Sequence, residues 1–326
     1  MDRRTLLVAV AAGAASAPLR VFAQAKGIPR IGYLQTYPSL DDRYFAAFRK
    51  QLQVLGRVEG KTVAIEYRSA EGKYDRLPTL AAELVRLNVD VIVADGGTPS
   101  AVAARNATQT IPIVFVAVAD PVAQGIVASL ARPGGNVTGT SGQQAAWAAK
   151  LLELFKEIFP SAKRVAVLSN PGNSSLPGVL REMTTAAKSL HLEIRAFDVR
   201  TPDDLERVFV EIGRMQPAGI IQLVDTLLTS EAGRIAGLAA KYRLPILGGH
   251  NAVPENGGFM SYGPNRLDVV RHAAVLADKI LKGAKPSELP IELPLNYDLI
   301  VNMKTAKALG LKIPPAVLVR AERVIE

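Results

Sequence analysis

The chain has 326 residues, a formal net charge of +9 and no cysteine, and 48% of its residues are hydrophobic. This length exceeds what one hydrophobic core usually supports, so we expect two lobes. The lack of cysteine excludes disulfides, thiolate metal sites and a cysteine nucleophile. The positive charge is dispersed along predicted helices and forms no basic tract interleaved with aromatic residues, so we expect no nucleic-acid partner.

The first 25 residues have the layout of a signal peptide. Arg3 and Arg4 precede an apolar stretch, 6–17, and small residues follow at Ala23 and Ala25. The stretch is too short to cross a bilayer, whose apolar core needs about 20 residues. We therefore expect export to the periplasm, either by the Sec route or, because of the paired arginines, by the Tat route.

From Ile28 onward, short apolar runs rich in β-formers alternate with amphipathic helical segments, which is the pattern of parallel βαβ units. The second half of the chain, beginning at 164–168, repeats the landmarks of the first half in the same order. The strands predicted for the first half are 31–34, 63–66, 91–94 and 113–116. The repeat predicts an α/β fold of two doubly wound parallel-sheet lobes, whose strand ends face one cleft.

The segment after the second repeat predicts a hinge with several crossings, because it still contains one extended stretch and two helices. We expect the first lobe at 28–138 plus 264–288, the second lobe at 139–258 plus 298–312, and hinge crossings at 259–263 and 289–297. Two lobes joined in this way can close over a small molecule.

Several strings spread over nearly the whole chain match one family. Among them are Asp120-Pro121-Val122, the stretch 129–139, Ser261-Tyr262-Gly263-Pro264 and the stretch 280–286. On these strings the sequence resembles the ABC transporter substrate-binding proteins of the tryptophan/tyrosine-binding type, which have a type I periplasmic-binding fold.

The resemblance implies a monomeric, non-enzymatic protein that binds a small polar molecule, an amino acid or a related carboxylate. It also implies two partners, the membrane permease of an ABC importer and its cytoplasmic ATPase. A periplasmic sensor that binds the same ligand and docks on a receptor kinase fits the sequence as well. The resemblance does not name the ligand, because the residues after the first strand and His250 depart from the usual family pattern.

Loops that follow parallel strands bring backbone N–H groups and helix N-termini to the edge where α/β sheets bind ligands. Position relative to the predicted strands and crossings therefore nominates the ligand-binding candidates. They are Gln35, Thr36, Tyr37, Tyr44, Gly97, Thr98, Asp120, Ser141, Asn173, Asp225, His250 and Tyr262.

Several candidates have a structural interpretation beside the functional one. Thr98 can cap the helix that follows it, and Asp120 can cap a helix that begins at Pro121. A capping role is less obvious for Asp225, whose carboxylate could instead receive a ligand ammonium. Tyr262 could stack on a ligand or pack in the hinge, whereas Trp147 is expected to pack in the core or hinge.

An enzyme is not expected from this sequence. The only imidazoles are His191, His250 and His272, and only His250 is expected near the cleft. Ser141 does not stand in a Gly-x-Ser-x-Gly string, and the glycine patterns typical of nucleotide-binding loops are missing from the sequence. Since the histidines also lack the spacing of metal ligands, we expect no catalytic residue, no cofactor and no metal.

Overall fold

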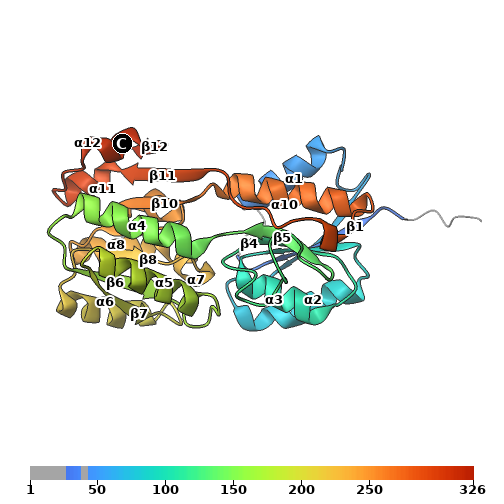
Figure 1. Ribbon diagram of the computed structural model, residues 1–326, viewed down its shortest axis with the longest axis horizontal. Coiled ribbons are helices and arrows are strands. Elements are labelled where there is room, and N and C mark those ends of the chain that lie inside the picture. The colour runs from blue at the N-terminus through green and yellow to red at the C-terminus, as the bar shows by residue number, and fades with distance from the viewer. Residues whose placement is uncertain (1–26, 38–42) are drawn as a thin grey trace, which may run out of the picture.

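The computed structural model describes residues 27–37 and 43–326, which form two α/β lobes lying side by side (Figure 1). The first lobe contains a five-stranded parallel sheet in the order β2-β1-β3-β4-β5. Its strands are β1 (Arg30–Gln35), β2 (Ala64–Ser69), β3 (Val91–Asp95), β4 (Ile113–Val118) and β5 (Val137–Ser141).

Helices cover both faces of the first sheet. The helices of this lobe are α1 (Arg43–Val54), η1 (Tyr74–Arg76), α2 (Leu77–Arg86), α3 (Thr98–Ala107), α10 (Arg266–Leu281) and η2 (Pro286–Glu288). One face packs against α1 and α10, where Phe48 and Ala274 share a cluster with Tyr33, and the other face packs against α2 and α3. Small residues on α10, such as Ala273 and Ala277, are fully buried there, so α10 can lie close against the sheet.

The second lobe contains a seven-stranded sheet in the order β12-β11-β10-β9-β8-β6-β7. All neighbouring strands are parallel except β10 and β11. The strands are β6 (Arg164–Ser169), β7 (Glu193–Asp198), β8 (Ile220–Gln222), β9 (Ile246–Gly248), β10 (Met260–Pro264), β11 (Tyr297–Asn302) and β12 (Arg323–Ile325).

This sheet also has a hydrophobic cluster on each face. Its helices are α4 (Gln144–Ile158), α5 (Leu176–Ser189), α6 (Asp204–Met215), α7 (Thr226–Ser230), α8 (Ala232–Lys241), α9 (Ala252–Glu255), α11 (Met303–Ala308) and α12 (Pro315–Val319). One cluster includes Phe155 of α4 and Met183 of α5, and the other includes Phe209 of α6 and Ile235 of α8. The predicted α/β fold class of two lobes with parallel sheets is confirmed.

The chain passes between the lobes three times: after β5, after β10 and between η2 and β11. The stretch 259–263, expected as a crossing, instead lies largely in β10, where it pairs with β9 and β11. The chain also continues beyond 312, the expected end of the second lobe, into α12 and β12. No helix among the described residues is long and apolar enough to span a membrane.

Asp278 of α10 binds Arg57, which lies in the turn after α1. Its side chain is only 5% exposed, it accepts a hydrogen bond from Arg57 Nε at 2.8 Å, and it lies 2.6 Å from Lys282 Nζ. Burial raises the pKa of Asp278, but the hydrogen bonds from Lys282 and Arg57 outweigh burial and leave the pKa below its usual value. The carboxylate therefore stays ionised in the folded protein at neutral pH.

We predict that Asp278→Ala lowers the free energy of unfolding by about 1.5–3 kcal/mol at pH 7, the range for hydrogen bonds to charged groups. A depressed carboxyl pKa stabilises the fold above the unfolded-state pKa, about 3.9, and this stabilisation is lost as the pH falls through the folded-state pKa. Urea unfolding at neutral and acidic pH should therefore show that the difference in free energy of unfolding between the wild type and Asp278→Ala becomes smaller in acid. Glu288→Ala, at a largely exposed carboxylate, is the control; an equal loss there would contradict the assignment.

Candidate functional site

A cavity of about 520 Å³, partly open to solvent, lies between the two lobes. Most of its lining residues follow the carboxyl end of a strand or lie at a crossing. The described lining residues are Tyr37, Ala117, Gly142, Gln144, Trp147, Val224, Gly249, His250, Asn251, Pro264, Arg266 and Val269.

The indole of Trp147, in the first turns of α4, forms part of the cavity wall. Its Nε1 donates a hydrogen bond to the carbonyl of Gly142 at 3.1 Å, and the ring lies directly against Gly249. A Cβ atom on Gly249 would stand 2.0 Å from the indole Cη2. The indole can occupy this place only because residue 249 has no side chain.

Arg266, the first residue of α10, brings a buried cation to the cavity. Its Nη2 donates to Oδ1 of Asp95 at the end of β3, and the Tyr33 hydroxyl donates to Oδ2 at 2.7 Å. The guanidinium carbon also lies 5.8 Å from the ring centre of Tyr37 and 5.6 Å from that of Tyr44. Burial lowers the pKa of Arg266, but Asp95 and the neighbouring tyrosines together outweigh burial and raise the pKa, so the guanidinium keeps its charge.

Asp225 is the centre of a second polar network, directly after β8. Its carboxylate is the N-cap of α7, where it accepts from the backbone N–H groups of residues 227 and 228. It also accepts from Asn170 Nδ2 and Asn173 Nδ2, both at 3.1 Å, and from the Tyr74 hydroxyl at 2.5 Å. Tyr74 belongs to the first lobe, so this network spans the cleft.

His250, directly after β9, faces the first lobe. Its Nδ1 accepts from the Ala252 N–H at 3.1 Å, so in the neutral ring Nε2 carries the hydrogen, 3.4 Å from the Tyr44 hydroxyl oxygen. Burial lowers the pKa of His250 to about 3, and the charges of Arg266 and Arg43 add to the effect. The imidazole is therefore neutral at physiological pH.

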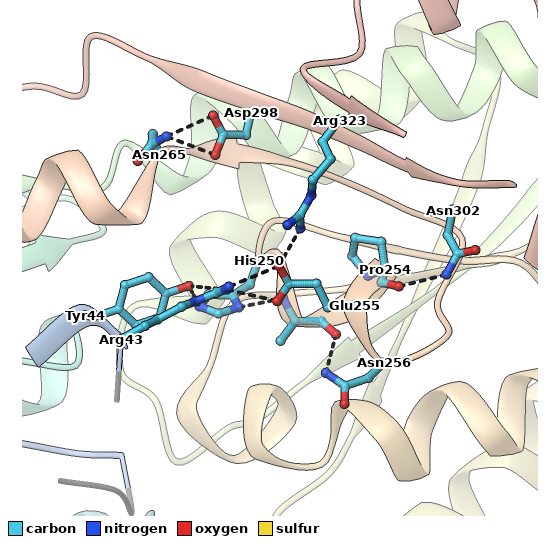
Figure 2. A network of polar contacts seen from close by, with 11 residues as sticks. Arg43, Tyr44, His250, Pro254, Glu255, Asn256, Asn265, Asp298, Asn302 and Arg323 are labelled. Carbon is cyan, nitrogen blue, oxygen red and sulfur yellow. Dashed lines mark hydrogen bonds and ion pairs between the residues drawn. The ribbon is translucent and has the colours of Figure 1, made fainter. Parts of the chain in front are cut away.

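Beside His250, Glu255 of α9 accepts hydrogen bonds from Arg43 of the first lobe and Arg323 of the second, as Figure 2 shows. A fourth contact across the cleft joins the hydroxyls of Thr36 and Thr226 at 2.9 Å. The facing loops thus touch at several polar pairs, and the lobes are closed upon each other.

The sequence model of one family, described as ABC transporter substrate binding protein, matches residues 35–325 of this chain. This chain belongs to that family. A curated relative, the tyrosine-binding protein of Clostridioides difficile strain R20291, is 29% identical over 283 residues, 86% of this chain and 80% of the relative. The match confirms the family expected from the sequence strings.

Two solved structures of family-like proteins cover 91% of this chain and 99% of their own. An ABC domain from Streptococcus pneumoniae in complex with L-Trp is 25% identical with a TM-score of 0.83. A ligand-free, open substrate-binding protein with adhesive properties from Clostridium difficile is 27% identical with a TM-score of 0.68. The type I periplasmic-binding fold expected from the resemblance is confirmed.

The structure places the predicted site residues in three groups. Tyr37 and His250 line the cavity. A second group makes or supports the contacts between the facing loops: Thr36, Tyr44, Asn173 and Asp225. The third group lies outside the described cavity lining: Gln35, Gly97, Thr98, Asp120, Ser141 and Tyr262.

Each residue of the third group has a structural partner. Asp120 is exposed and accepts from the backbone N–H groups of residues 122 and 123, as in the capping interpretation. Gly97, rather than Thr98, is the N-cap of α3, with a φ of 79° that favours glycine. Tyr262 stacks on Tyr297 with ring centres 5.7 Å apart, which is the packing interpretation.

The remaining partners of this group are local as well. Thr98 Oγ1 accepts from the Ala119 N–H at 3.4 Å, and Gln35 accepts from the Tyr67 hydroxyl at 2.6 Å. Ser141 accepts from the N–H of Gln143 at 3.2 Å. Ligand contact by all twelve candidates stays a prediction.

Sequence reasoning missed Arg266, Asp95, Gln144 and Asn251, and it assigned Trp147 to packing alone. The expectation that Asp225 has no obvious capping role was wrong, because its carboxylate caps α7. Arg266 had one usable signal: a cation in the first turn of a helix opposes the helix dipole and therefore needs a special partner. No cluster of three or more potential metal ligands occurs among the described residues.

We predict that Gly249→Ala displaces the Trp147 indole and destabilises the fold by about 1–3 kcal/mol, as overpacking does. Trp147 is the only tryptophan in the sequence, so its fluorescence spectrum should shift in the variant. Gly237→Ala, in α8 with open space around the added methyl group, is the matched control. An unchanged spectrum in Gly249→Ala would refute the contact.

We also predict an acid sensitivity caused by His250. A buried histidine whose folded-state pKa lies below its unfolded value of about 6.5 costs stability as the pH falls through that window, about 2 kcal/mol at pH 5. The melting temperature of the wild type should drop between pH 7 and pH 5, and the melting temperature of His250→Gln should drop less. Replacing the exposed His191 by Gln should leave the pH profile unchanged. Equal profiles for the wild type and His250→Gln would exclude this cause.

Proposed function

We propose that this chain is the periplasmic solute-binding subunit of an ABC importer. It binds a small polar molecule, an amino acid or a related carboxylate, between its lobes and delivers it to the permease. The observation that carries the proposal is the cavity lined by strand ends and crossings of both lobes, with a buried charged pair at its wall. Membership of the substrate-binding family supports the same role.

Ligand binding is coupled to closure of the lobes in this proposal. Three crossings let the lobes rotate about a common hinge, and closure forms the contacts from Tyr74 to Asp225 and from Arg43 to Glu255. The higher TM-score with the L-Trp complex than with the open structure, at similar identity, supports a closed arrangement here. A ligand that touches both lobes favours this state, because it binds the open state less well.

We infer a binding role without catalysis. The family to which the chain belongs supports this inference, since its description is that of a binding protein. His250 is the only histidine in the described cavity lining, and its low pKa makes it a poor proton acceptor at neutral pH.

Export to the periplasm belongs to the same proposal. The predicted signal peptide at 1–25 lies outside the residues that the structure describes. N-terminal sequencing of the protein recovered from the periplasm tests the export. A protein that keeps its first residues and stays in the cytoplasm would overturn the periplasmic role.

A thermal-shift screen of amino acids, aromatic acids, purines and sugars tests the binding function. A ligand at 100 times its dissociation constant should stabilise the protein by about 2.7 kcal/mol. Small-angle scattering then measures whether that ligand brings the radius of gyration to the value expected for closed lobes. Loss of uptake in a deletion strain distinguishes an importer subunit from a receptor-kinase sensor, which would leave uptake intact.

We predict that Tyr74→Phe weakens ligand binding about tenfold or more, because it removes a hydrogen bond to a carboxylate across the cleft. Burial and the charge of Asp225 raise the pKa of Tyr74, so its hydroxyl stays protonated and donates. Isothermal titration measures the effect with whichever ligand the screen finds. Tyr242→Phe, in the second lobe beside Phe209, is the control. Unchanged affinity in Tyr74→Phe would remove this contact from the closing mechanism.

A further inference from the structure

Of the described cavity lining, Arg266 alone combines a buried, charged group with an unused donor. Its side chain is 12% exposed, and its Nε is fully buried without a hydrogen-bond partner. Nη2 is already engaged with Asp95. A buried guanidinium N–H without an acceptor is costly, so an acceptor supplied by a bound molecule would satisfy it.

The acceptor that fits a guanidinium best is a carboxylate. The guanidinium is planar and presents its N–H groups as a rigid fork, which matches the two oxygens of a carboxylate. Asp95 is fully buried and holds the guanidinium by Nη2, which leaves Nε for another acceptor. Because Nε is buried in this closed arrangement, the wall beside it has to move aside when a ligand oxygen binds there.

The rest of the described wall fits a flat, largely apolar body. The Trp147 indole lies against Gly249, and Pro264, Val269 and Ala117 add apolar surface. Aromatic rings are well matched by such walls, because they bury much area and stack face to face or edge to face.

Among the residues that the structure describes, the two buried carboxylates of the site, Asp95 and Asp225, already have partners. Asp95 accepts from Tyr33 and Arg266, and Asp225 accepts from Tyr74, two asparagine amides and two backbone N–H groups. An α-ammonium group of a ligand would have to displace donors from one of these networks to be recognised there. Asp225, whose carboxylate could receive an ammonium according to the sequence, already accepts from these five donors.

We propose that the ligands of this site are planar aromatic monocarboxylates, held through the carboxylate by Arg266 Nε, and that an α-ammonium group is not required. This inference rests on the proposed binding function and narrows its ligand class. It makes Arg266 the specificity-determining residue of the cavity.

Three matched probes test the ligand class on the wild-type protein: phenylpropionate, L-phenylalanine and phenethylamine. They share the phenyl ring and differ in the carboxylate and the ammonium. Trp147 fluorescence reports binding directly, since this single tryptophan lines the cavity and the probes contain no indole. We expect phenylpropionate to bind at least as tightly as L-phenylalanine, and phenethylamine not to bind.

Several results would overturn the inference. These are tighter binding of phenethylamine than of phenylpropionate, binding of L-phenylalanine about tenfold or more tighter than phenylpropionate, and no binding of phenylpropionate. If phenylpropionate fails while another molecule from the screen binds and closes the lobes, only this inference falls. If no molecule binds and closes the lobes, the proposed function falls with it.

Arg266→Lys tests the residue, because it keeps a cation beside Asp95 but lacks Nε. We expect phenylpropionate affinity to fall about tenfold to a hundredfold, the range for hydrogen bonds to charged groups. Arg271→Lys, on the same helix but paired with Asp268 and outside the described cavity lining, should change it much less. If the variant does not fold, the methyl ester of phenylpropionate tests the same contact on the wild-type protein. We expect the ester to bind at least about tenfold more weakly than the acid. Equal binding of ester and acid would refute the carboxylate contact.

Discussion

The buried ion pair between Arg266 and Asp95 is the interaction on which the geometry of the cleft depends. It joins the first residue after the second crossing to the end of β3, so it fixes where α10 begins on the first lobe. A cation at a helix N-terminus opposes the helix dipole, and burying it costs desolvation. Asp95, supported by the Tyr33 hydroxyl, offsets both costs. The same pair holds a guanidinium at the cavity wall, so hinge position and ligand recognition have one physical origin.

Closure of the lobes relies on polar contacts that water can replace. The contacts of Tyr74 with Asp225 and of Thr36 with Thr226 exchange protein partners for water when the lobes separate, so their net contribution is modest. Asp225 keeps its asparagine and backbone donors inside the second lobe in either state. In the proposed closing mechanism, the contacts of a ligand with both lobes add to these polar contacts and favour the closed state.

The sequence predicted the lobes far better than the site, for a physical reason. Strands such as β1 and β6 are recognisable because apolar runs and helix periodicity are local signals, and the repeat placed their ends at one cleft. Arg266 and Asp95 are 171 positions apart and meet only in the folded chain. Trp147 lies in a helix whose apolar pattern predicts packing, and its place at the cavity depends on distant Gly249. The stretch expected as a crossing at 259–263 lies largely in β10, and its pairing with β11 is also non-local.

The arrangement explains how one fold can serve different ligands. The sheets of both lobes position strand ends, and several lining side chains, such as Trp147 and Arg266, come from the starts of helices next to the crossings. A lining residue outside the core clusters, such as Gln144 or His250, can change without disturbing those clusters. Relatives described as binding tyrosine or L-Trp therefore inform the fold and the closure more than the ligand of this chain. The ligand is set by local chemistry, and here that chemistry is a buried guanidinium between aromatic walls.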